Sequence, residues 1–140
     1  MIILDMNLVS EVMKPAPAAV VTQWLLGIPR SEISITAISL AEILRGIRRL
    51  PRGKKGTALQ KNFDEFLNLG FRNRVLSFDA PAADAYASIV DGRSRRGRPI
   101  SMLDAMVAAI AQTAKADIAT RDTGGFEDCG VRLIDPWQAA

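Results

Sequence analysis

The chain has 140 residues, of which 49% are hydrophobic and 24% charged, and its formal net charge is +3 at pH 7. This size and composition correspond to about one globular domain over residues 1–140, and they exclude a collagen-like repeat or a largely disordered chain. There is no histidine and one cysteine, Cys129, which excludes histidine-dependent catalysis, histidine-ligated zinc and an internal disulfide.

The N-terminal part predicts two strands and two short helices. Residues 1–4 form an apolar run that ends at Asp5, which is typical of a buried strand in a parallel sheet. Short helices are predicted over residues 8–13 and 17–26, because prolines separate the two segments. A second strand is predicted over residues 33–35.

The middle of the chain predicts two amphipathic helices and a strand. Apolar residues recur at helical spacing over residues 39–49, until Pro51 and Gly53 end the pattern. Residues 57–69 carry their apolar side chains on one face and are followed by a glycine, which predicts a further helix. A third strand is predicted over residues 75–78.

The C-terminal part predicts helices over residues 81–96 and 101–114 and short strands over residues 116–120 and 131–134. Strands that alternate with helices indicate a parallel sheet covered on both faces. The predicted fold class is therefore α/β, a three-layer α/β/α domain with a central parallel sheet of four to five short strands.

Nothing in the chain resembles a membrane or export signal. No apolar run approaches the roughly 18 residues that span a bilayer, and residues 1–5 lack the basic segment that opens a secretory signal. A single cysteine also suits a reducing compartment. We expect a cytoplasmic protein without a membrane partner.

Four acidic residues are expected at one edge of the sheet, and without histidine any catalysis depends on such carboxylates. Asp5 ends the first strand, and Asp122 follows the strand over residues 116–120. Glu42 and Asp104 fall in the first turns of helices that start at the same edge. Because function gathers at the carboxyl ends of parallel strands, the sequence predicts that these four side chains form one cluster.

Each of these acids also has a structural interpretation. The segments Ser39-Leu-Ala-Glu42 and Ser101-Met-Leu-Asp104 both match a capping box, and acids after strands are common in turns. The combination is harder to explain this way, because two carboxylates about 5 Å apart repel by roughly 3 kcal/mol at an effective dielectric of 20. Protons or a divalent cation would neutralise such a cluster.

Clustered oxygen ligands without histidine or thiolate suit Mg²⁺ or Mn²⁺. A metal held by a few carboxylates leaves room for a phosphate oxygen and a water, which favours phosphodiester hydrolysis. Two basic clusters suit backbone phosphates, although a solvated helix face explains each equally well. The first cluster comprises Arg45, Arg48, Arg49, Arg52, Lys54 and Lys55, and the second comprises Arg93, Arg95, Arg96 and Arg98.

Five ordered motifs lie between Met1 and Trp137. They are Ile3-Leu-Asp5-Met-Asn7 with Ser10-Glu11, Ser39-Leu-Ala-Glu42-Ile-Leu-Arg-Gly46, Pro99-Ile-Ser-Met-Leu-Asp104-Ala, Ala119-Thr-Arg-Asp122-Thr-Gly-Gly-Phe126 and Asp135-Pro-Trp137. With these motifs the chain resembles the PIN-domain ribonucleases, specifically the toxins of VapBC and FitAB type toxin–antitoxin pairs.

The resemblance implies an endonuclease that cuts RNA with Mg²⁺ or Mn²⁺. It implies that the metal pocket consists of Asp5, Glu42, Asp104 and Asp122. Asn7 and Thr120 would support this pocket, and Ser39 would lie near its rim, with Arg45 expected to bind substrate. Similar proteins are homodimers that a small DNA-binding antitoxin neutralises by laying its C-terminal segment over the pocket.

The chain departs from the family pattern at two positions. Met6 stands where the family generally has a threonine or serine, so a hydroxyl able to orient the metal ligands is missing. Gly125 stands where many relatives place an acid, whereas Asp122 occupies a position that is often asparagine in them. The fourth acid is thus expected in the manner of the FitB-like branch.

Two alternative functions stay open. In the first, Met6 weakens catalysis and the PIN domain acts mainly as an antitoxin-binding co-repressor or an RNA-binding module. In the second, the chain is a receiver-like or phosphatase-like domain with an aspartate as phosphoryl acceptor. Asp5-Met6-Asn7 has no second acid beside that acceptor, and Lys115 lies at the wrong end of its helix, which disfavours the second.

Overall fold

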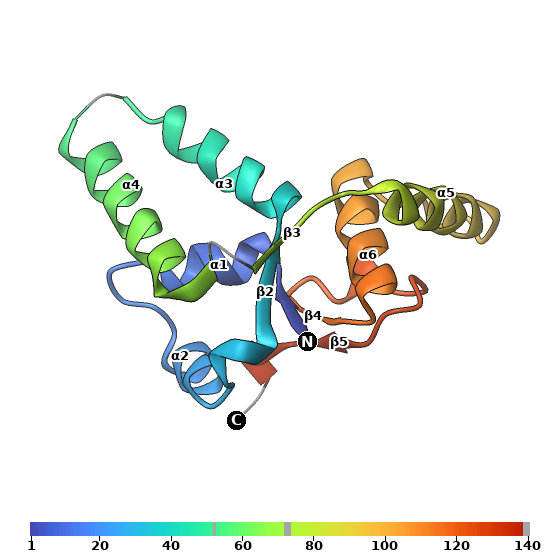
Figure 1. Ribbon diagram of the computed structural model, residues 1–140, viewed down its shortest axis with the longest axis horizontal. Coiled ribbons are helices and arrows are strands. Elements are labelled where there is room, and N and C mark those ends of the chain that lie inside the picture. The colour runs from blue at the N-terminus through green and yellow to red at the C-terminus, as the bar shows by residue number, and fades with distance from the viewer. Residues whose placement is uncertain (52, 72–73, 139–140) are drawn as a thin grey trace.

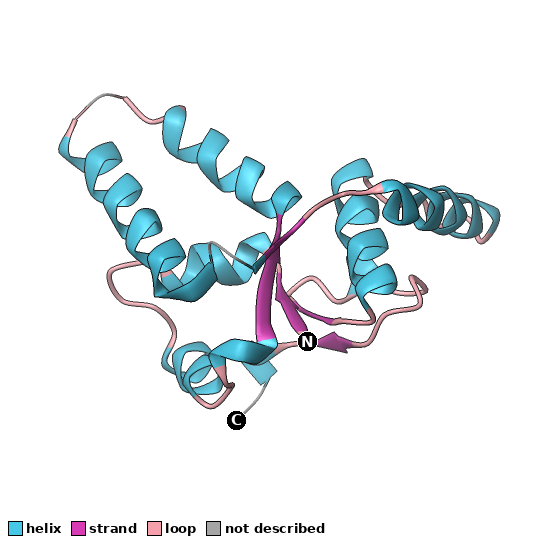
Figure 2. Cartoon of the chain, viewed as in Figure 1, coloured by secondary structure: helices cyan, strands magenta, loops and turns pink. Residues whose placement is uncertain are grey.

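The centre of the molecule is a parallel five-stranded sheet with the strand order β3-β2-β1-β4-β5 (Figures 1 and 2). This computed structural model describes residues 1–51, 53–71 and 74–138. The strands are β1 (Ile2–Leu4), β2 (Ile33–Thr36), β3 (Val75–Leu76), β4 (Asp117–Ala119) and β5 (Leu133–Ile134). All neighbouring pairs are parallel, which confirms the predicted sheet.

The sheet is buried on both faces, and its central strand β1 is apolar throughout. Successive side chains of a strand point to opposite faces, so Ile3 and Leu4 of β1 enter different hydrophobic clusters. Ile118 and Ala119 of β4, which pair with these two residues, divide in the same way. The middle of the sheet therefore packs between two separate hydrophobic cores, one on each face.

Helices form the two outer layers (Figure 1). One layer contains α1 (Met6–Val12), α2 (Ala19–Leu26), α3 (Ala37–Arg48) and α4 (Lys54–Phe66), and the other contains α5 (Ala80–Arg95) and α6 (Met102–Ala114). Single turns or short irregular helices occur at η1 (Arg30–Glu32), η2 (Leu67–Phe71), η4 (Gly124–Phe126) and η5 (Pro136–Gln138). This arrangement confirms the three-layer α/β/α prediction. None of the described helices is long and apolar enough to cross a membrane.

The start of α3 differs from the prediction. Thr36 caps this helix, because its Oγ1 accepts a hydrogen bond of 3.1 Å from the Ser39 backbone N–H. Ser39 is consequently the third residue of the helix, and Glu42 lies in the second turn instead of the first. The capping-box interpretation of Ser39 and Glu42 is therefore wrong, since Thr36 already fills the cap position.

Other predicted elements are present with shifted ends. The capping interpretation of Ser101 is confirmed, because its Oγ accepts a hydrogen bond of 3.2 Å from the Asp104 N–H at the start of α6. Asp79 caps α5 in the same way through the Ala82 N–H, 3.0 Å away. The strand predicted to reach residue 78 stops at Leu76. Local capping thus sets the edges that hydrophobic periodicity does not.

Replacing Thr36 with valine tests the observed cap. The substitution keeps the size of this fully buried side chain but removes the acceptor for the Ser39 N–H. Loss of a capping side chain costs about 0.5–2 kcal/mol, so we expect urea titration to show a free energy of unfolding lower by that amount.

Thr22→Val in α2 is the matched control, because the Thr22 hydroxyl only donates to the Ala18 carbonyl of the preceding turn. Its expected effect is below about 0.5 kcal/mol. Equal losses in both variants would contradict the capping role of Thr36.

Candidate active site

Asp5 lies at the carboxyl end of the central strand, between β1 and α1. Its backbone N–H donates to the Ala119 carbonyl at 3.0 Å, and its own carbonyl accepts from the N–H groups of Leu8 and Val9. The residue therefore belongs to both the sheet and the first helix. The side chain is 9% exposed, so its carboxylate is held at a fixed place with little access to water.

A hydrogen-bond network fixes the Asp5 carboxylate from the neighbouring strand end. Its Oδ2 accepts from the Thr120 hydroxyl at 2.9 Å and from the Asn7 amide at 3.3 Å. The Thr120 Oγ1 also accepts from Asn7 Nδ2 at 3.1 Å and from the Asp122 N–H at 3.0 Å. Thr120 and Asn7 thus support the acidic cluster and connect the ends of β1 and β4.

The loop after β4 holds the Asp122 side chain against Gly125. The Gly125 N–H donates to Asp122 Oδ1 at 3.1 Å. A Cβ atom at Gly125 would lie 2.5 Å from Asp122 Oδ2, closer than real contacts allow. Glycine at this position is therefore what lets the Asp122 carboxylate lie where it does.

Electrostatic coupling shows that the four acids share one neighbourhood. Burial raises the pKa of Asp5, and the charges of Asp104 and Asp122 raise it further, against the lowering effect of the Thr120 hydroxyl and the Met6 N–H. Burial and the charges of Asp5 and Asp104 likewise raise the pKa of Glu42. Like-charge repulsion of this kind acts only over short distances.

Asp104 contributes to this cluster from the first turn of α6. Burial is the main cause that raises the pKa of Asp104, and the charge of Asp122 raises it further. A hydrogen bond with Ser101 and the charge of Arg93 lower it. Asp104 is thus an acid partly withdrawn from water and within reach of the charge of Asp122.

The donor set suits a hard divalent cation, because it consists of carboxylate oxygens whose charges repel one another. As the side chains stand, no three histidine, cysteine or acidic residues of the described part of the chain are arranged to hold a metal ion. Metal binding by these carboxylates would therefore require them to draw closer together. Neutralising their mutual repulsion would favour that change.

Ser39 does not have the role that the resemblance implied. Its side chain is fully buried and accepts a hydrogen bond from the Thr36 hydroxyl at 3.3 Å. A side chain without solvent access cannot contact a substrate. The prediction that Ser39 lies at the rim of the site is therefore wrong. Thr120 is equally buried, and its hydroxyl serves Asp5 instead of facing outward.

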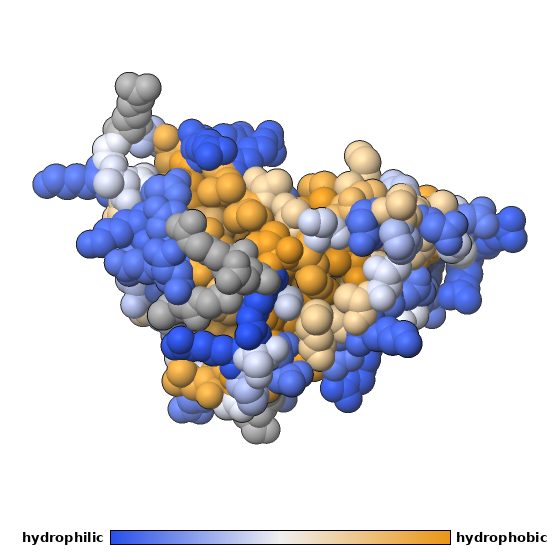
Figure 3. Space-filling model, in the orientation of Figure 1, coloured by the Kyte–Doolittle hydropathy of each residue, from blue (hydrophilic) through white to orange (hydrophobic). Residues whose placement is uncertain are grey.

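Arg45 is exposed on α3, one turn after Glu42. Together with Met6 and Glu42 it lines a groove of about 350 Å³ that reaches Leu103 of α6. A second groove of about 370 Å³ also contains Met6 and Glu42 and extends toward Lys14. Figure 3 shows hydrophobic surface over the middle of one face of the molecule, between hydrophilic flanks. The Met6 side chain therefore belongs to the surface beside the acids.

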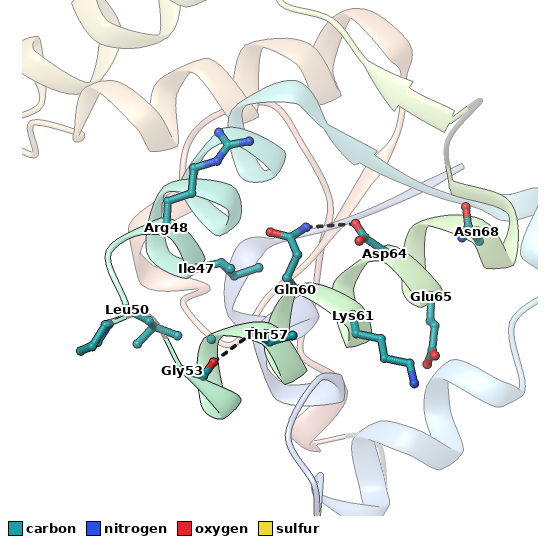
Figure 4. A pocket seen from close by; sticks show the side chains of 12 residues that line it. Ile47, Arg48, Leu50, Gly53, Thr57, Gln60, Lys61, Asp64, Glu65 and Asn68 are labelled. Atoms are coloured by element: carbon teal, nitrogen blue, oxygen red, sulfur yellow. Dashed lines mark hydrogen bonds between the residues drawn. The ribbon is translucent and has the colours of Figure 1, made fainter.

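A larger cavity lies elsewhere. It measures about 730 Å³ between α3 and α4, and Figure 4 shows Arg48, Lys61 and Asp64 among its lining side chains. Its hydrogen bonds are local, such as that from Gln60 Nε2 to Asp64 Oδ1 at 3.0 Å. None of the four clustered acids lines it, so its size does not make it the active site.

The second basic cluster is not a free phosphate-binding surface. Arg95 pairs with Asp91, Arg96 with Asp128, and Arg98 with Glu127 and Asp128. Arg93 is 5% exposed and donates to backbone carbonyls. In the first cluster, Arg52 lies outside the described residues.

Sequence reasoning missed the burial of Arg93, although a signal for it exists. Ala82, Ala85 and Ile89 of α5 are buried at helical spacing, and Arg93 follows Ile89 by four residues. Residues four apart lie on the same face of a helix. The arginine thus continues the apolar face of α5 into the core, where the sequence suggested a solvated patch.

Comparison with known proteins agrees with this geometry. Residues 2–130 match the family model of the PIN domain. The chain belongs to the PIN-domain family. Nucleases of this family generally depend on a divalent metal. Membership of this family also excludes the alternative of a receiver-like or phosphatase-like domain, because the PIN family model matches residues 2–130.

Full-length relatives of this PIN domain are similar over almost the whole chain. It is 38% identical to the plasmid stability protein StbB of Pseudomonas syringae pv. tomato, covering 99% of this chain and 100% of that protein. It is 35% identical to toxin FitB of Neisseria gonorrhoeae, covering 98% and 99%. It is 34% identical to VapC ribonuclease Y4jK of Sinorhizobium fredii, covering 100% of both chains.

Solved structures repeat this similarity. The crystal structure of FitAcB from Neisseria gonorrhoeae has a TM-score of 0.92 at 36% identity and covers 99% of both chains. A structure of FitAB bound to an IR36 DNA fragment also has a TM-score of 0.92, at 35% identity, covering 98% of this chain and 96% of that one. The PIN fold described above is therefore shared in detail with these proteins.

The burial of Asp104, together with repulsion by Asp122, predicts that removing its charge stabilises the metal-free protein. Because the pKa of Asp104 is raised in the folded state, the folded protein binds the Asp104 proton more tightly than the unfolded chain does. The stability therefore falls as the pH rises above 3.8, the ordinary pKa of an aspartate. We expect Asp104→Asn to melt at a higher temperature than the wild type at pH 7.5 in EDTA. The gain shrinks as the pH is lowered toward 3.8.

The matched control is Asp91→Asn in α5, an exposed acid paired with Arg95 one turn later. Losing such a pair costs only about 0.3–0.5 kcal/mol, so this variant melts slightly below the wild type at pH 7.5. Differential scanning calorimetry measures both variants. A lower melting temperature for Asp104→Asn at pH 7.5 would contradict the prediction, because it would show that the buried charge of Asp104 costs the protein no stability.

Proposed function

We propose that this PIN domain, acting as one unit over residues 1–140, is the endoribonuclease toxin of a toxin–antitoxin pair. The observation that carries the proposal is the coupled cluster of Asp5, Glu42, Asp104 and Asp122 at one edge of the sheet. The likeness to a toxin and to a ribonuclease over nearly their full lengths supports it. RNA is the proposed substrate, and the cytoplasm is the proposed location.

In this proposal Asp5 and Asp104 are the principal ligands of Mg²⁺ or Mn²⁺, and Glu42 and Asp122 complete the pocket. Such a cation supplies an activated water and offsets the charge of the phosphate that is attacked. Thr120 and Asn7 orient the Asp5 carboxylate through two hydrogen bonds, so the carboxylates around it are the ones that would draw closer to the ion. Glu42 and Asp122 are the candidates to accept the proton of the attacking water.

Exposed arginines of α3 suit the phosphates on either side of the cleaved bond. Arg45 follows Glu42 by one turn, and Arg48 and Arg49 continue along the same end of the helix. Each basic side chain that neutralises a phosphate strengthens binding in a salt-dependent way. We assign the positioning of RNA to these residues, with Arg45 nearest to the acids.

A small antitoxin with a DNA-binding part is the proposed protein partner. The similar FitAB complex has been solved bound to DNA. The grooves on both sides of Met6 contain Glu42, so a peptide segment seated there would cover the acids. Met102 is 64% exposed at the start of α6, and this apolar surface suits the second copy of the proposed homodimer.

The proposal predicts cleavage of RNA by the purified protein with Mg²⁺ or Mn²⁺ and no cleavage with EDTA. Asp5→Asn and Asp104→Asn each reduce cleavage by about 100-fold or more, a typical loss when a group in the reacting centre is removed. Asp91→Asn keeps the wild-type rate, since Asp91 pairs with Arg95 on the exposed side of α5. Gel analysis of a labelled RNA measures all four proteins.

Cleavage that persists undiminished in Asp5→Asn and Asp104→Asn would rule out the proposed centre, because both would then be dispensable. Cleavage that resists EDTA would rule out the metal. Loss of activity in Asp91→Asn as well would show that the assay reports general destabilisation.

A second candidate function, a weakened nuclease that acts mainly as a co-repressor or RNA-binding module, follows from Met6. Its apolar side chain lines the grooves beside Glu42, where the family pattern has a hydroxyl. If Met6 has weakened catalysis, Met6→Thr raises the RNA cleavage rate by at least about 10-fold, which is the size of effect typical of groups that support metal ligands.

The proposed nuclease function predicts little change in the RNA cleavage rate for Met6→Thr. Met6→Thr then changes the cleavage rate by less than about threefold, because Asn7 and Thr120 already hold Asp5. Rates of the two proteins are compared at saturating Mn²⁺. An inactive wild type with an active Met6→Thr variant would support the second candidate function, a nuclease that Met6 has weakened.

A further inference from the structure

Arg93 is a buried cation that the nuclease proposal leaves without a role. It lies in the last turn of α5 and is 5% exposed. Taking a guanidinium out of water is unfavourable unless hydrogen bonds replace its hydration. A buried arginine at this place therefore indicates that its contacts are needed.

Its contacts join three parts of the backbone. The Nε atom donates to the Arg98 carbonyl at 2.6 Å, just beyond the end of α5. The Nη1 atom donates to the carbonyls of Gly125 at 3.1 Å and Glu127 at 2.8 Å. The planar guanidinium thus fastens the loop after β4 to the end of α5, in a geometry that a lysine ammonium does not reproduce.

The same loop places an acid of the candidate site. The carbonyl of Gly125 accepts from Arg93, and its N–H donates to Asp122 Oδ1 at 3.1 Å. The α carbon of Gly125 lies so close to the Asp122 carboxylate that no Cβ fits between them. A shift of Gly125 therefore shifts Asp122.

Other links between α5 and the loop are weaker and lie further along the chain. Arg98 pairs with Glu127 at 2.9 Å, and Arg96 with Asp128 at 3.4 Å. These pairs are largely exposed and screened by salt. They hold the part of the loop that follows Gly125. Arg93, in contrast, binds Gly125 itself, the residue that contacts Asp122.

We propose that Arg93 is a positioning residue, which holds the Asp122 carboxylate in the acidic site through the Gly125 backbone. The proposal rests on the proposed function, because it treats Asp122 as part of a metal-dependent nuclease site. Arg93 itself lies behind the loop and contacts neither the acids nor a substrate. Its effect is on where Asp122 lies.

Arg93→Lys is the informative variant, because it keeps the positive charge that acts on Asp104 but loses the guanidinium, whose Nε and Nη1 atoms together bind three backbone carbonyls. We expect its Kd for Mn²⁺, measured by electron paramagnetic resonance, to rise by about 10-fold or more, as is typical for groups that orient metal ligands. The kcat on a labelled RNA that the wild type cuts falls by a similar factor. The KM for that RNA changes by less than about twofold, since the binding surface of α3 is untouched.

Ile89→Val is the matched control for stability. Ile89 lies on the same buried face of α5, one turn before Arg93, and its apolar side chain packs in the hydrophobic core without holding a loop carbonyl. This variant melts below the wild type but keeps its Kd for Mn²⁺ and its kcat. Gly125→Ala is a second test that leaves Arg93 unchanged, and we expect it to raise the Mn²⁺ Kd because the added Cβ displaces Asp122.

The coupling between Arg93 and Asp122 is tested by combining variants. In an Asp122→Asn background, Arg93→Lys changes the Mn²⁺ Kd by less than about twofold, because the carboxylate it positions is already gone. Additive losses in the double variant would overturn the proposal, as would an unchanged Mn²⁺ Kd in Arg93→Lys or in Gly125→Ala. A wild type that neither binds Mn²⁺ nor cuts RNA would overturn the proposed function itself, and the role of Arg93 with it.

Discussion

The burial of several carboxylates, which also repel one another, at one edge of a parallel sheet is the constraint on which the rest of this structure depends. Asp5, Asp104 and Asp122 come from segments far apart in the sequence, and the charges of Asp104 and Asp122 both act on Asp5. A fold that gathers like charges loses stability in doing so. The surrounding structure has to be rigid enough to hold these side chains in spite of their repulsion.

That rigidity comes from the sheet and from a few polar groups. Alternate residues of β1 and β4 pack into the two hydrophobic clusters. The strand ends that carry Asp5 and Thr120 therefore have little freedom to move. Thr120 uses one hydroxyl to serve both Asp5 and the backbone of Asp122. On the far side of the loop, Arg93 brings a positive charge that lowers the pKa of Asp104. The site is thus supported from behind by groups that do not face the solvent.

The parts of this arrangement that depend on local signals could be predicted from the sequence. Short apolar runs identified the strands, Ser101 identified the start of α6, and the parallel topology brought Asp5 and Asp122 to one edge. The start of α3 could not be predicted, because Thr36 and Ser39 are both able to cap a helix and only tertiary packing selects between them. The partners of Arg93 could not be predicted either. Its helical spacing from Ile89 indicates burial, but the carbonyls of Gly125 and Glu127 that it binds come from a loop that only the tertiary fold packs on α5.

The main chain of position 6 explains how the site tolerates a methionine there. The Met6 N–H lowers the pKa of Asp5, and any residue other than proline provides that group. The remaining stabilisation of the Asp5 carboxylate comes from Thr120 and Asn7. The Met6 side chain instead lines the grooves next to Glu42. A change at this position therefore alters the apolar surface that a substrate or a partner segment meets more than it alters the network that holds the acid.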